Sequence, residues 1–227
     1  MALILNIDTA TEHASLALSE EGKVIATTSN KEIRDHASWI HNALQQLLQN
    51  TGYTLSQLEA IAITAGPGSY TGLRVGMATA KGLCYVLNIP LILENTLKVM
   101  ARAYIEAFNH KPGILSLLVP MIDARRMEVF TAVYDQALRE VIPPMAMVLD
   151  ATSFEGVNPD TRLICFGSGS LKFQAIARKD RFEFVELAPE AGAMAFFAHQ
   201  KFKNKEFADL AYAEPLYLKE FYSPAKK

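Results

Sequence analysis

The feature that most constrains the fold of this chain is a glycine-rich turn between a buried strand and a long helix. Residues 58–65 alternate apolar side chains and predict a strand, after which Gly66-Pro67-Gly68 turns the chain sharply. Glycine tolerates positive φ and proline fixes its own φ, so this tripeptide favours a tight turn. Ser69 and Thr71 are placed to cap a helix that we expect to run to about Leu87.

Small residues recur at every fourth position from this turn into the helix, which places them on one helix face. They are Gly68, Gly72, Gly76, Ala80 and Cys84. Each interior glycine costs about 1 kcal/mol of helix propensity, so close packing or a ligand must offset that loss. The spacing leaves two interpretations open, tight packing or an anion site at the helix N-terminus. The stretch has neither the Gly-Lys-Ser/Thr of a Walker loop nor the G-x-G-x-x-G pattern.

The composition indicates a globular protein. The chain has 227 residues, 50% hydrophobic and 20% charged, which is enough to bury a sizeable core. A net charge of −2 argues against a protein that binds nucleic acid by itself. Cys84 and Cys165 have no metal-binding or redox spacing, which suits a reduced compartment. No signal peptide or membrane-spanning run is recognisable, so we expect a soluble, cytoplasmic protein.

Strand-like and helix-like segments alternate in both halves of the chain. Strands are expected at residues 2–7, 14–19, 23–28, 58–65, 90–94, 114–122, 127–134, 139–149 and 163–166, and helices at 35–50, 69–87, 96–108 and 191–202. The clearest break is at 109–113, and Pro143-Pro144 should bend or end its strand. Gly167-Ser168-Gly169-Ser170 opens a further helix, and the tail from Ala213 is expected to cross back as a strand or extended arm. Residue identities show no repeat, but the shared order predicts an α/β architecture with a common plan.

The first expected helix carries the only tryptophan. Its core stripe is Ile40, Ala43, Leu44, Leu47 and Leu48. Trp39 points about 100° away from the centre of that stripe. This residue either flanks the core or anchors an interface with another protein.

Four segments, in this order along the chain, resemble the TsaB family of bacterial tRNA threonylcarbamoyladenosine biosynthesis proteins, once labelled glycoprotease-like. They are Ile7-Asp8-Thr9-Ala10-Thr11, residues 66–82, Ile122-Asp123-Ala124-Arg125 with Glu128-Val129, and Ala213-Glu214-Pro215-Leu216-Tyr217-Leu218. Together they span almost the whole chain. Two positions depart from the family pattern, since Arg126-Met127 replaces the expected Met-Gly and Lys219 replaces the usual Arg.

The resemblance implies an α/β fold of the two-lobed actin/hexokinase/Hsp70-like (ASKHA) kind, with mixed sheets flanked by helices. Residues 1–109 would form the N-terminal lobe, completed by a segment at about 190–220, and residues 110–189 a smaller second lobe. In that superfamily a hairpin like the one that carries Asp8, Thr9 and Thr11 approaches the phosphates or metal of a nucleotide. The alternative is an Asp that only satisfies turn amides. We take the hairpin as vestigial and expect no cofactor, beyond a weakly held or interface-bound nucleotide.

The comparison with TsaD, the relative that transfers the threonylcarbamoyl group, predicts that this chain has no metal centre. In TsaD the segment after the corresponding strand carries two metal-binding histidines, and here Thr96 and Met100 occupy their positions. Neither side chain binds iron or zinc as imidazole does, and Lys98 adds a positive charge where a cation would sit. The chain is also too short for the complete second lobe of TsaD.

The resemblance therefore predicts a pseudoenzyme, a non-catalytic subunit that pairs with TsaD and is joined by the small ATPase TsaE. This assembly would make N6-threonylcarbamoyladenosine beside the anticodon of tRNAs that read codons beginning with A. In the absence of TsaD the chain would form a homodimer. It would contact tRNA only as part of the complex, and it would not bind a membrane. The alternative is an ATP-dependent phosphotransferase of the acetate- or sugar-kinase kind that uses Asp8 and Thr11. A peptidase finds no support, because no nucleophile motif such as G-x-S-x-G is present.

The resemblance also implies a helix-to-helix contact made by the first two long helices of each partner. The residues expected there are Trp39, Tyr70, Gly72, Arg74, Gly76, Met77, Ala80 and Lys81. Two arrangements are open. In the first, the small residues Gly72, Gly76 and Ala80 form a groove that receives the partner. In the second, the small residues face the protein's own sheet, and the opposite side of the helix meets the partner through Tyr70, Arg74, Met77 and Lys81.

Overall fold

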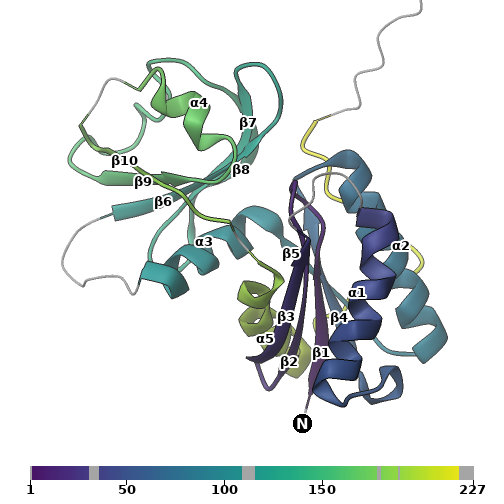
Figure 1. The fold of residues 1–227 in the computed structure, drawn as a ribbon. Coiled ribbons are helices and arrows are strands. Elements are labelled where there is room, and N and C mark those ends of the chain that lie inside the picture. Colours follow the sequence, from purple (N-terminus) through teal and green to yellow (C-terminus); the bar gives the residue numbers. More distant parts are fainter. Residues whose placement is uncertain (1, 31–35, 109–115, 178–179, 189, 220–227) are drawn as a thin grey trace, which may run out of the picture.

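The computed structural model describes residues 2–30, 36–108, 116–177, 180–188 and 190–219. These residues form two five-stranded sheets with helices between and outside them (Figure 1). The strands of the first sheet are β1 (Leu3–Asp8), β2 (Ala14–Glu20), β3 (Lys23–Asn30), β4 (Ala60–Gly66) and β5 (Leu91–Asn95). Those of the second are β6 (Ser116–Asp123), β7 (Glu128–Tyr134), β8 (Glu140–Val148), β9 (Arg162–Phe166) and β10 (Phe182–Val185). The helices are α1 (His36–Thr51), α2 (Tyr70–Leu87), α3 (Thr96–Phe108), α4 (Ser170–Gln174) and α5 (Ala195–Asn204), with short 3₁₀ turns η1 (Leu55–Gln57) and η2 (Ala191–Met194).

The two sheets are built on the same plan. The first has the order β3-β2-β1-β4-β5 and the second, read from its other edge, has the matching order β8-β7-β6-β9-β10. In each sheet the first strand pairs antiparallel with the second and parallel with the fourth. The predicted α/β fold with mixed sheets and a common plan is therefore confirmed, although the two halves share no obvious repeat in sequence.

The alternation of side chains along the strands separates the cores. Leu3, Leu5 and Ile7 of β1 pack with the apolar stripes of α1 and α2. Ile4 of the same strand faces the opposite way and packs with η2, α5 and part of α3. Helix α3 also covers one face of the second sheet, and α4 with the 150–157 loop covers the other. Helix α3 therefore lies between the sheets, while α1 and α2 lie side by side on the outer face of the first (Figure 1).

Several expected element boundaries agree with the structure, and a few do not. The helix expected at 96–108 is α3, and the 191–202 helix begins as the 3₁₀ turn η2 before α5. Strand β10 was not predicted, and the break at 109–113 falls outside the described residues. Pro143-Pro144 does not end β8, because β8 is an edge strand and its pairing with β7 is shifted at these prolines.

The C-terminal arm, residues 205–219, crosses back over the first sheet and α2 without forming a named strand. Ala208 makes a single antiparallel bridge with Leu91 of β5. The Leu216 amide then donates a hydrogen bond of 2.7 Å to the Ala65 carbonyl at the end of β4. The arm was expected to return in this way, and its path brings it over the glycine-rich turn. In the described part of the chain, no helix combines the length and apolar character needed to cross a membrane.

Candidate functional site

The hairpin after β1 holds Asp8 inside the protein. The side chain is 1% exposed, and its Oδ1 accepts hydrogen bonds from the Ala10 amide at 3.0 Å and the Thr64 hydroxyl at 2.8 Å. Burial raises the pKa of the Asp8 carboxyl, against the opposing effect of these two hydrogen bonds and of nearby His36. Asp8 therefore satisfies a turn amide, as the second interpretation of the sequence proposed.

The two threonines of the hairpin tie it to the helices. Thr9 is fully buried, and its hydroxyl donates a 2.8 Å hydrogen bond to the Gly72 carbonyl in the first turn of α2. Thr11 is half-buried and its hydroxyl donates to the His13 carbonyl at 3.3 Å, while His36 Nε2 of α1 lies 3.1 Å from the Thr11 carbonyl oxygen. The Asp8 and Thr9 side chains thus bond within the protein, and Thr11 has the greatest access to solvent.

The small face of α2 packs on this hairpin. A Cβ added to Gly72 would lie 2.1 Å from the Thr9 carbonyl oxygen, and one added to Gly76 would lie 2.2 Å from Thr9 Oγ1. Gly68 is equally close to the hairpin, since its Cβ would lie 2.2 Å from the Ala10 carbonyl oxygen. Ser69 caps the helix by accepting a hydrogen bond from the Gly72 amide, whereas Thr71 lies inside the first turn and is not the cap.

The expectation that Gly72, Gly76 and Ala80 form an open groove for a partner is therefore wrong, because the protein's own hairpin and sheet fill the space beside them. The second arrangement placed Met77 on the opposite, outward side of α2, and this placement is also wrong. It is 4% exposed and packs in the core beneath α2. Met77 lies four residues after buried Leu73, so both point toward the sheet.

The two charged residues of α2 contact the C-terminal arm. Lys81 Nζ donates to the Ala211 and Ala213 carbonyls at 3.2 and 2.9 Å. Arg74 Nε donates to the Tyr217 hydroxyl at 3.1 Å, and the Arg74 guanidinium lies 4.0 Å from the centre of the Tyr70 ring. Both cations therefore sit at the side of α2 that the arm follows.

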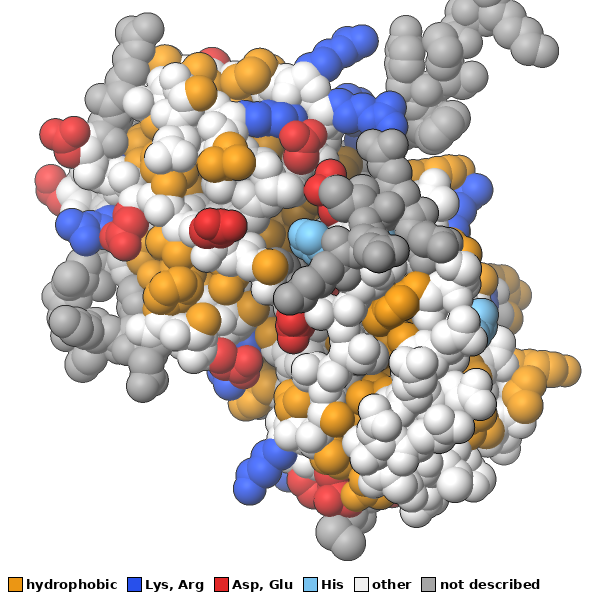
Figure 2. Space-filling model, in the orientation of Figure 1, with side chains coloured by type: hydrophobic (Ala, Val, Ile, Leu, Met, Phe, Trp, Pro, Cys, Tyr) orange, Lys and Arg blue, Asp and Glu red, His pale blue; other side chains and the backbone are white. Residues whose placement is uncertain are grey.

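The rest of the outer surface of α1 and α2 carries no charge, and we call it the α1–α2 face. On α1 it comprises the exposed residues Ala37, Ser38, His41, Asn42, Gln45, Gln46, Gln49 and Asn50. On α2 it comprises Val75, Ala78, Thr79, Gly82, Tyr85 and Val86. Figure 2 shows the region over α1, at the lower right, as largely free of acidic and basic side chains. Trp39 is half-buried and packs against the core at the edge of α1. The sequence contained a signal for this face, because residues 36–51 include no Asp, Glu, Lys or Arg.

The two residues that were expected to replace the metal ligands of TsaD lie in the core between the sheets. Thr96 and Met100 are almost fully buried on α3, and Met100 packs with residues of β6, β7 and β9. Asn95 Oδ1 accepts hydrogen bonds from the Leu97 and Lys98 amides and so caps α3. Among the described residues, no group of three or more His, Cys, Asp or Glu could hold a metal ion.

The second sheet repeats the features of the first at equivalent places. Asp123 ends β6 as Asp8 ends β1, and its Oδ1 likewise accepts from the amide two residues on, that of Arg125. The turn that begins at Gly167 follows β9 as the turn at Gly66 follows β4, and both glycines have positive φ. In this lobe, however, Asp123 is exposed and pairs with Lys172 Nζ of α4 at 2.8 Å.

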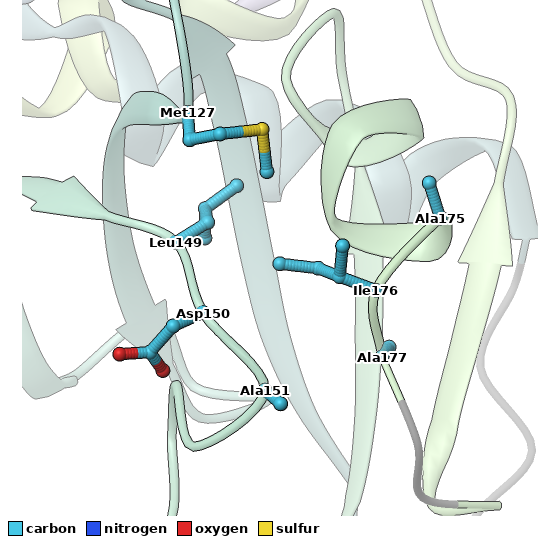
Figure 3. Close-up of a pocket in the computed structure, with 7 residues that line it drawn as sticks. All are labelled: Met127, Leu149, Asp150, Ala151, Ala175, Ile176 and Ala177. Carbon is cyan, nitrogen blue, oxygen red and sulfur yellow. The ribbon is translucent and has the colours of Figure 1, made fainter.

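A pocket of about 530 Å³ opens on the outer side of the second sheet (Figure 3). It is lined by Met127, Leu149, Asp150, Ala151, Ala175, Ile176 and Ala177. In Figure 3 the Met127, Leu149 and Ile176 side chains point toward one another, and the Asp150 carboxylate points away from them. Asp150 Oδ1 accepts hydrogen bonds from Thr152 and Ser153 of its own loop. No pair of acid and base groups is brought together here by the lining residues.

The cysteines do not form a nucleophilic site. Cys84 and Cys165 are both buried. Burial raises the pKa of Cys84 to about 11, and burial also raises the pKa of Cys165. A thiol that is buried and protonated is a poor nucleophile.

Two sheets of equal plan, each with a hairpin after its first strand and a glycine-containing turn after its fourth, define an ASKHA-class protein. The fold matches the ADPNP-bound activator of 2-hydroxyisocaproyl-CoA dehydratase from Clostridium difficile, with a TM-score of 0.52 and 10% identity over 91% of this chain and 98% of that one. A more similar structure is that of a Pseudomonas aeruginosa protein described as similar to peptidase YeaZ. It has a TM-score of 0.80 and 25% identity, and the match covers 96% of this chain and all of that one.

The sequence comparisons identify the family. A family model described as TsaD, tRNA N6-adenosine threonylcarbamoyltransferase, matches residues 23–215. The tRNA threonylcarbamoyladenosine biosynthesis protein TsaB of Bacillus subtilis is 30% identical over 98% of this chain and 96% of its own length. TsaB of Escherichia coli is also 30% identical, over 95% of this chain and 94% of its own length. The chain belongs to the TsaB family.

Proposed function

We propose that this protein is a non-catalytic subunit that pairs with TsaD in the formation of N6-threonylcarbamoyladenosine in tRNA. The names of its relatives and the match to the TsaD family model support this role. In this proposal TsaE joins the pair in the cytoplasm, and the modified tRNAs are those that read codons beginning with A. The chain meets tRNA as part of the complex.

The observation that carries the proposal is the chemistry of the α1–α2 face. Helix α2 is apolar on two sides, because one side packs in the core and the other presents Val75, Gly82 and Val86. Tyr85 and Val86 are 80% and 79% exposed. An apolar side of a helix is normally covered by packing, and the centres of protein interfaces are depleted of charge. The face therefore has the composition of a surface that a partner covers.

Gly82 supports a close approach by another helix. A Cβ added at this position would meet nothing within 4 Å, so the protein's own packing does not require glycine there. A glycine in an exposed helix interior costs about 1 kcal/mol relative to alanine. Contact with the backbone of a partner would offset that loss, in the way that Thr9 offsets it at Gly72.

The partner that best fits this face is TsaD, through the equivalent face of its related lobe. The match to the TsaD family model over residues 23–215 includes both helices, so TsaD is expected to carry a similar helix pair. Two such pairs would pack about a pseudo-twofold axis, with Trp39 at the edge. Because the face could also pack on a copy of itself, the proposal includes a homodimer when TsaD is absent.

The site residues support a subunit without its own chemistry. Asp8 Oδ1 accepts from Ala10 in the hairpin and Thr64 in β4, and the Thr9 hydroxyl donates to Gly72 in α2. In this proposal Thr96 and Met100 of α3 stand in place of metal ligands. In this proposal the hairpin is a vestige of a nucleotide site, and any nucleotide binds weakly or at the interface with TsaD. The rival function, an ATP-dependent phosphotransferase, would need the Asp8 carboxylate free to face a nucleotide.

Reconstitution of the modification tests the proposal. Unmodified tRNA transcript is incubated with TsaD, TsaE, this protein and the low-molecular-weight substrates, and each protein is omitted in turn. We expect no threonylcarbamoyladenosine without this protein and no ATP hydrolysis by this protein alone. Full modification in its absence would contradict the proposed role, and ATP turnover by the isolated chain would favour the phosphotransferase.

A further inference from the structure

The hairpin between β6 and β7 presents two consecutive arginines in an unusual backbone conformation. Arg125 and Arg126 have φ values of 70° and 49°, in the left-handed region that side chains other than glycine rarely adopt. The turn is fixed by hydrogen bonds from the Arg125 amide to Asp123 Oδ1 at 2.6 Å and from the Glu128 amide to the Arg125 carbonyl at 3.1 Å. Both side chains are exposed. Within the described residues, neither guanidinium has an ion pair or hydrogen bond.

The C-terminal arm brings aromatic and basic residues to the same hairpin. Lys219 Nζ forms an ion pair with Glu128 Oε2 at the start of β7. Tyr217 lies two residues earlier, 41% exposed, with its ring centre 5.3 Å from that of Tyr70. The Tyr217 hydroxyl accepts the hydrogen bond from Arg74. A segment of two residues spans only about 7 Å, so the Tyr217 backbone lies within about 7 Å of the Lys219 backbone, and the Lys219 side chain contacts the start of β7 beside the hairpin.

Together these residues form a surface that we call the arginine–tyrosine patch. It comprises Tyr70, Arg74, Asp123, Arg125, Arg126, Glu128, Lys172, Tyr217 and Lys219. Its cations outnumber its carboxylates, although the whole chain has a net charge of −2. Asp123 and Glu128 are each paired with a lysine, which leaves the two arginines as the free charges. Figure 2 shows Lys and Arg side chains gathered at the top of the view, where the second sheet meets the end of the described chain.

We propose that the arginine–tyrosine patch contacts RNA, with Arg125 and Arg126 at the phosphates and the exposed tyrosine ring stacked on an unpaired base. Unpaired bases in loops are recognised by aromatic stacking, and arginines contribute phosphate contacts. The patch combines both kinds of group, whereas the α1–α2 face has neither free cations nor an aromatic pair. This inference rests on the proposed function, in which the RNA is the tRNA held by the complex with TsaD.

The test measures the affinity of the complex for RNA. A fluorescently labelled, unmodified transcript of a tRNA that reads a codon beginning with A is titrated with the complex of this protein and TsaD, at several salt concentrations. We expect the Arg125→Gln/Arg126→Gln variant to bind about tenfold more weakly at low salt. Its plot of log affinity against log salt should be shallower by about 1.4–1.8, for two lost phosphate contacts. Tyr217→Ala should weaken binding of the transcript more than binding of a blunt RNA duplex without unpaired bases.

The matched control is Lys23→Gln/Lys203→Gln, which removes the same charge from exposed positions near β3 and α5. Equal affinities and equal salt slopes for the arginine variant and this control would overturn the proposal. Association with TsaD is measured separately by sedimentation without RNA. A loss of that association in the arginine variant would show that the patch binds protein, and would also overturn the proposal. If this protein and TsaD do not associate at all, the proposed function fails. The same RNA titration at low salt, made with the parent protein and its variants without TsaD, then still tests whether the patch binds RNA.

Discussion

Replacing Gly76 by alanine tests the packing of α2 on the hairpin. The added Cβ would lie 2.2 Å from Thr9 Oγ1 and 2.9 Å from Ile63 Cδ1, so the hairpin and strand β4 must move. Thr9 cannot move without weakening its buried hydrogen bond to the Gly72 carbonyl. The substitution therefore strains the packing on which the position of Asp8 depends.

The magnitude follows from three contributions. Overpacking of a tight core costs about 1–3 kcal/mol, and loss of a buried hydrogen-bond partner costs about 1–3 kcal/mol. Replacing a helical glycine by alanine regains about 1 kcal/mol. We therefore expect Gly76→Ala to lower the free energy of unfolding by about 3 kcal/mol. For a chain of this size this corresponds to a melting temperature lower by roughly 6–12 °C.

Gly82→Ala is the matched control on the same helix. Its added Cβ would meet nothing within 4 Å, so only the propensity gain remains in the monomer, and the monomeric protein should be stabilised by about 1 kcal/mol. Urea unfolding followed by circular dichroism measures both variants. If Gly76→Ala proves as stable as Gly82→Ala, the close packing between α2 and the hairpin is refuted.

The remaining predictions concern Asp8 and the metal-ligand positions. Because burial raises the pKa of Asp8, its ionised form favours the unfolded chain, and stability should fall as pH rises above the ordinary value of 3.8 through the raised pKa. In Asp8→Asn the side-chain oxygen can still accept the hydrogen bonds from Ala10 and Thr64. Urea unfolding should therefore show that the variant is more stable than the parent protein at pH 7, and this difference in the free energy of unfolding should disappear below pH 3.8. Asp8→Ala should retain most tRNA modification, and complete loss with folding and assembly intact would show that the hairpin is chemically active. Elemental analysis should find no stoichiometric iron or zinc, because Thr96 and Met100 are expected to stand where the relative has metal-binding histidines; one tightly held metal per chain would contradict this.

Local patterns predicted much of the fold. The apolar stripe of α1 was identified in full, because a single apolar face on an otherwise polar helix leaves one way to pack it. Strand β10 was missed because it has only four residues, too few for the alternation of its two phenylalanines with charged neighbours to stand out as a strand pattern. The equivalence of Asp8 and Asp123 was also hidden, because it depends on strand order and not on residue identity.

Helix α2 shows why the candidate site was harder to predict. Its residues are small or apolar on two sides, so periodicity alone does not say which side is buried. The hairpin at Thr9 decides the question, and it is brought to α2 by the pairing of β1 with β4, more than 50 residues apart in the sequence. The path of the C-terminal arm, which occupies Arg74 and Lys81, likewise depends on contacts between distant segments.

The central claim, that the protein acts by binding TsaD through the α1–α2 face, is tested most directly by placing a charge on that face. Val86 is 79% exposed, so Val86→Glu should leave the melting temperature of the monomeric protein unchanged. Leu171→Glu, at a residue of the second lobe that is 72% exposed, is the control. Sedimentation should show that Val86→Glu weakens association with TsaD by about tenfold or more, equivalent to about 1.4 kcal/mol, while Leu171→Glu associates like the parent protein. Equal association of both variants with TsaD would contradict the account.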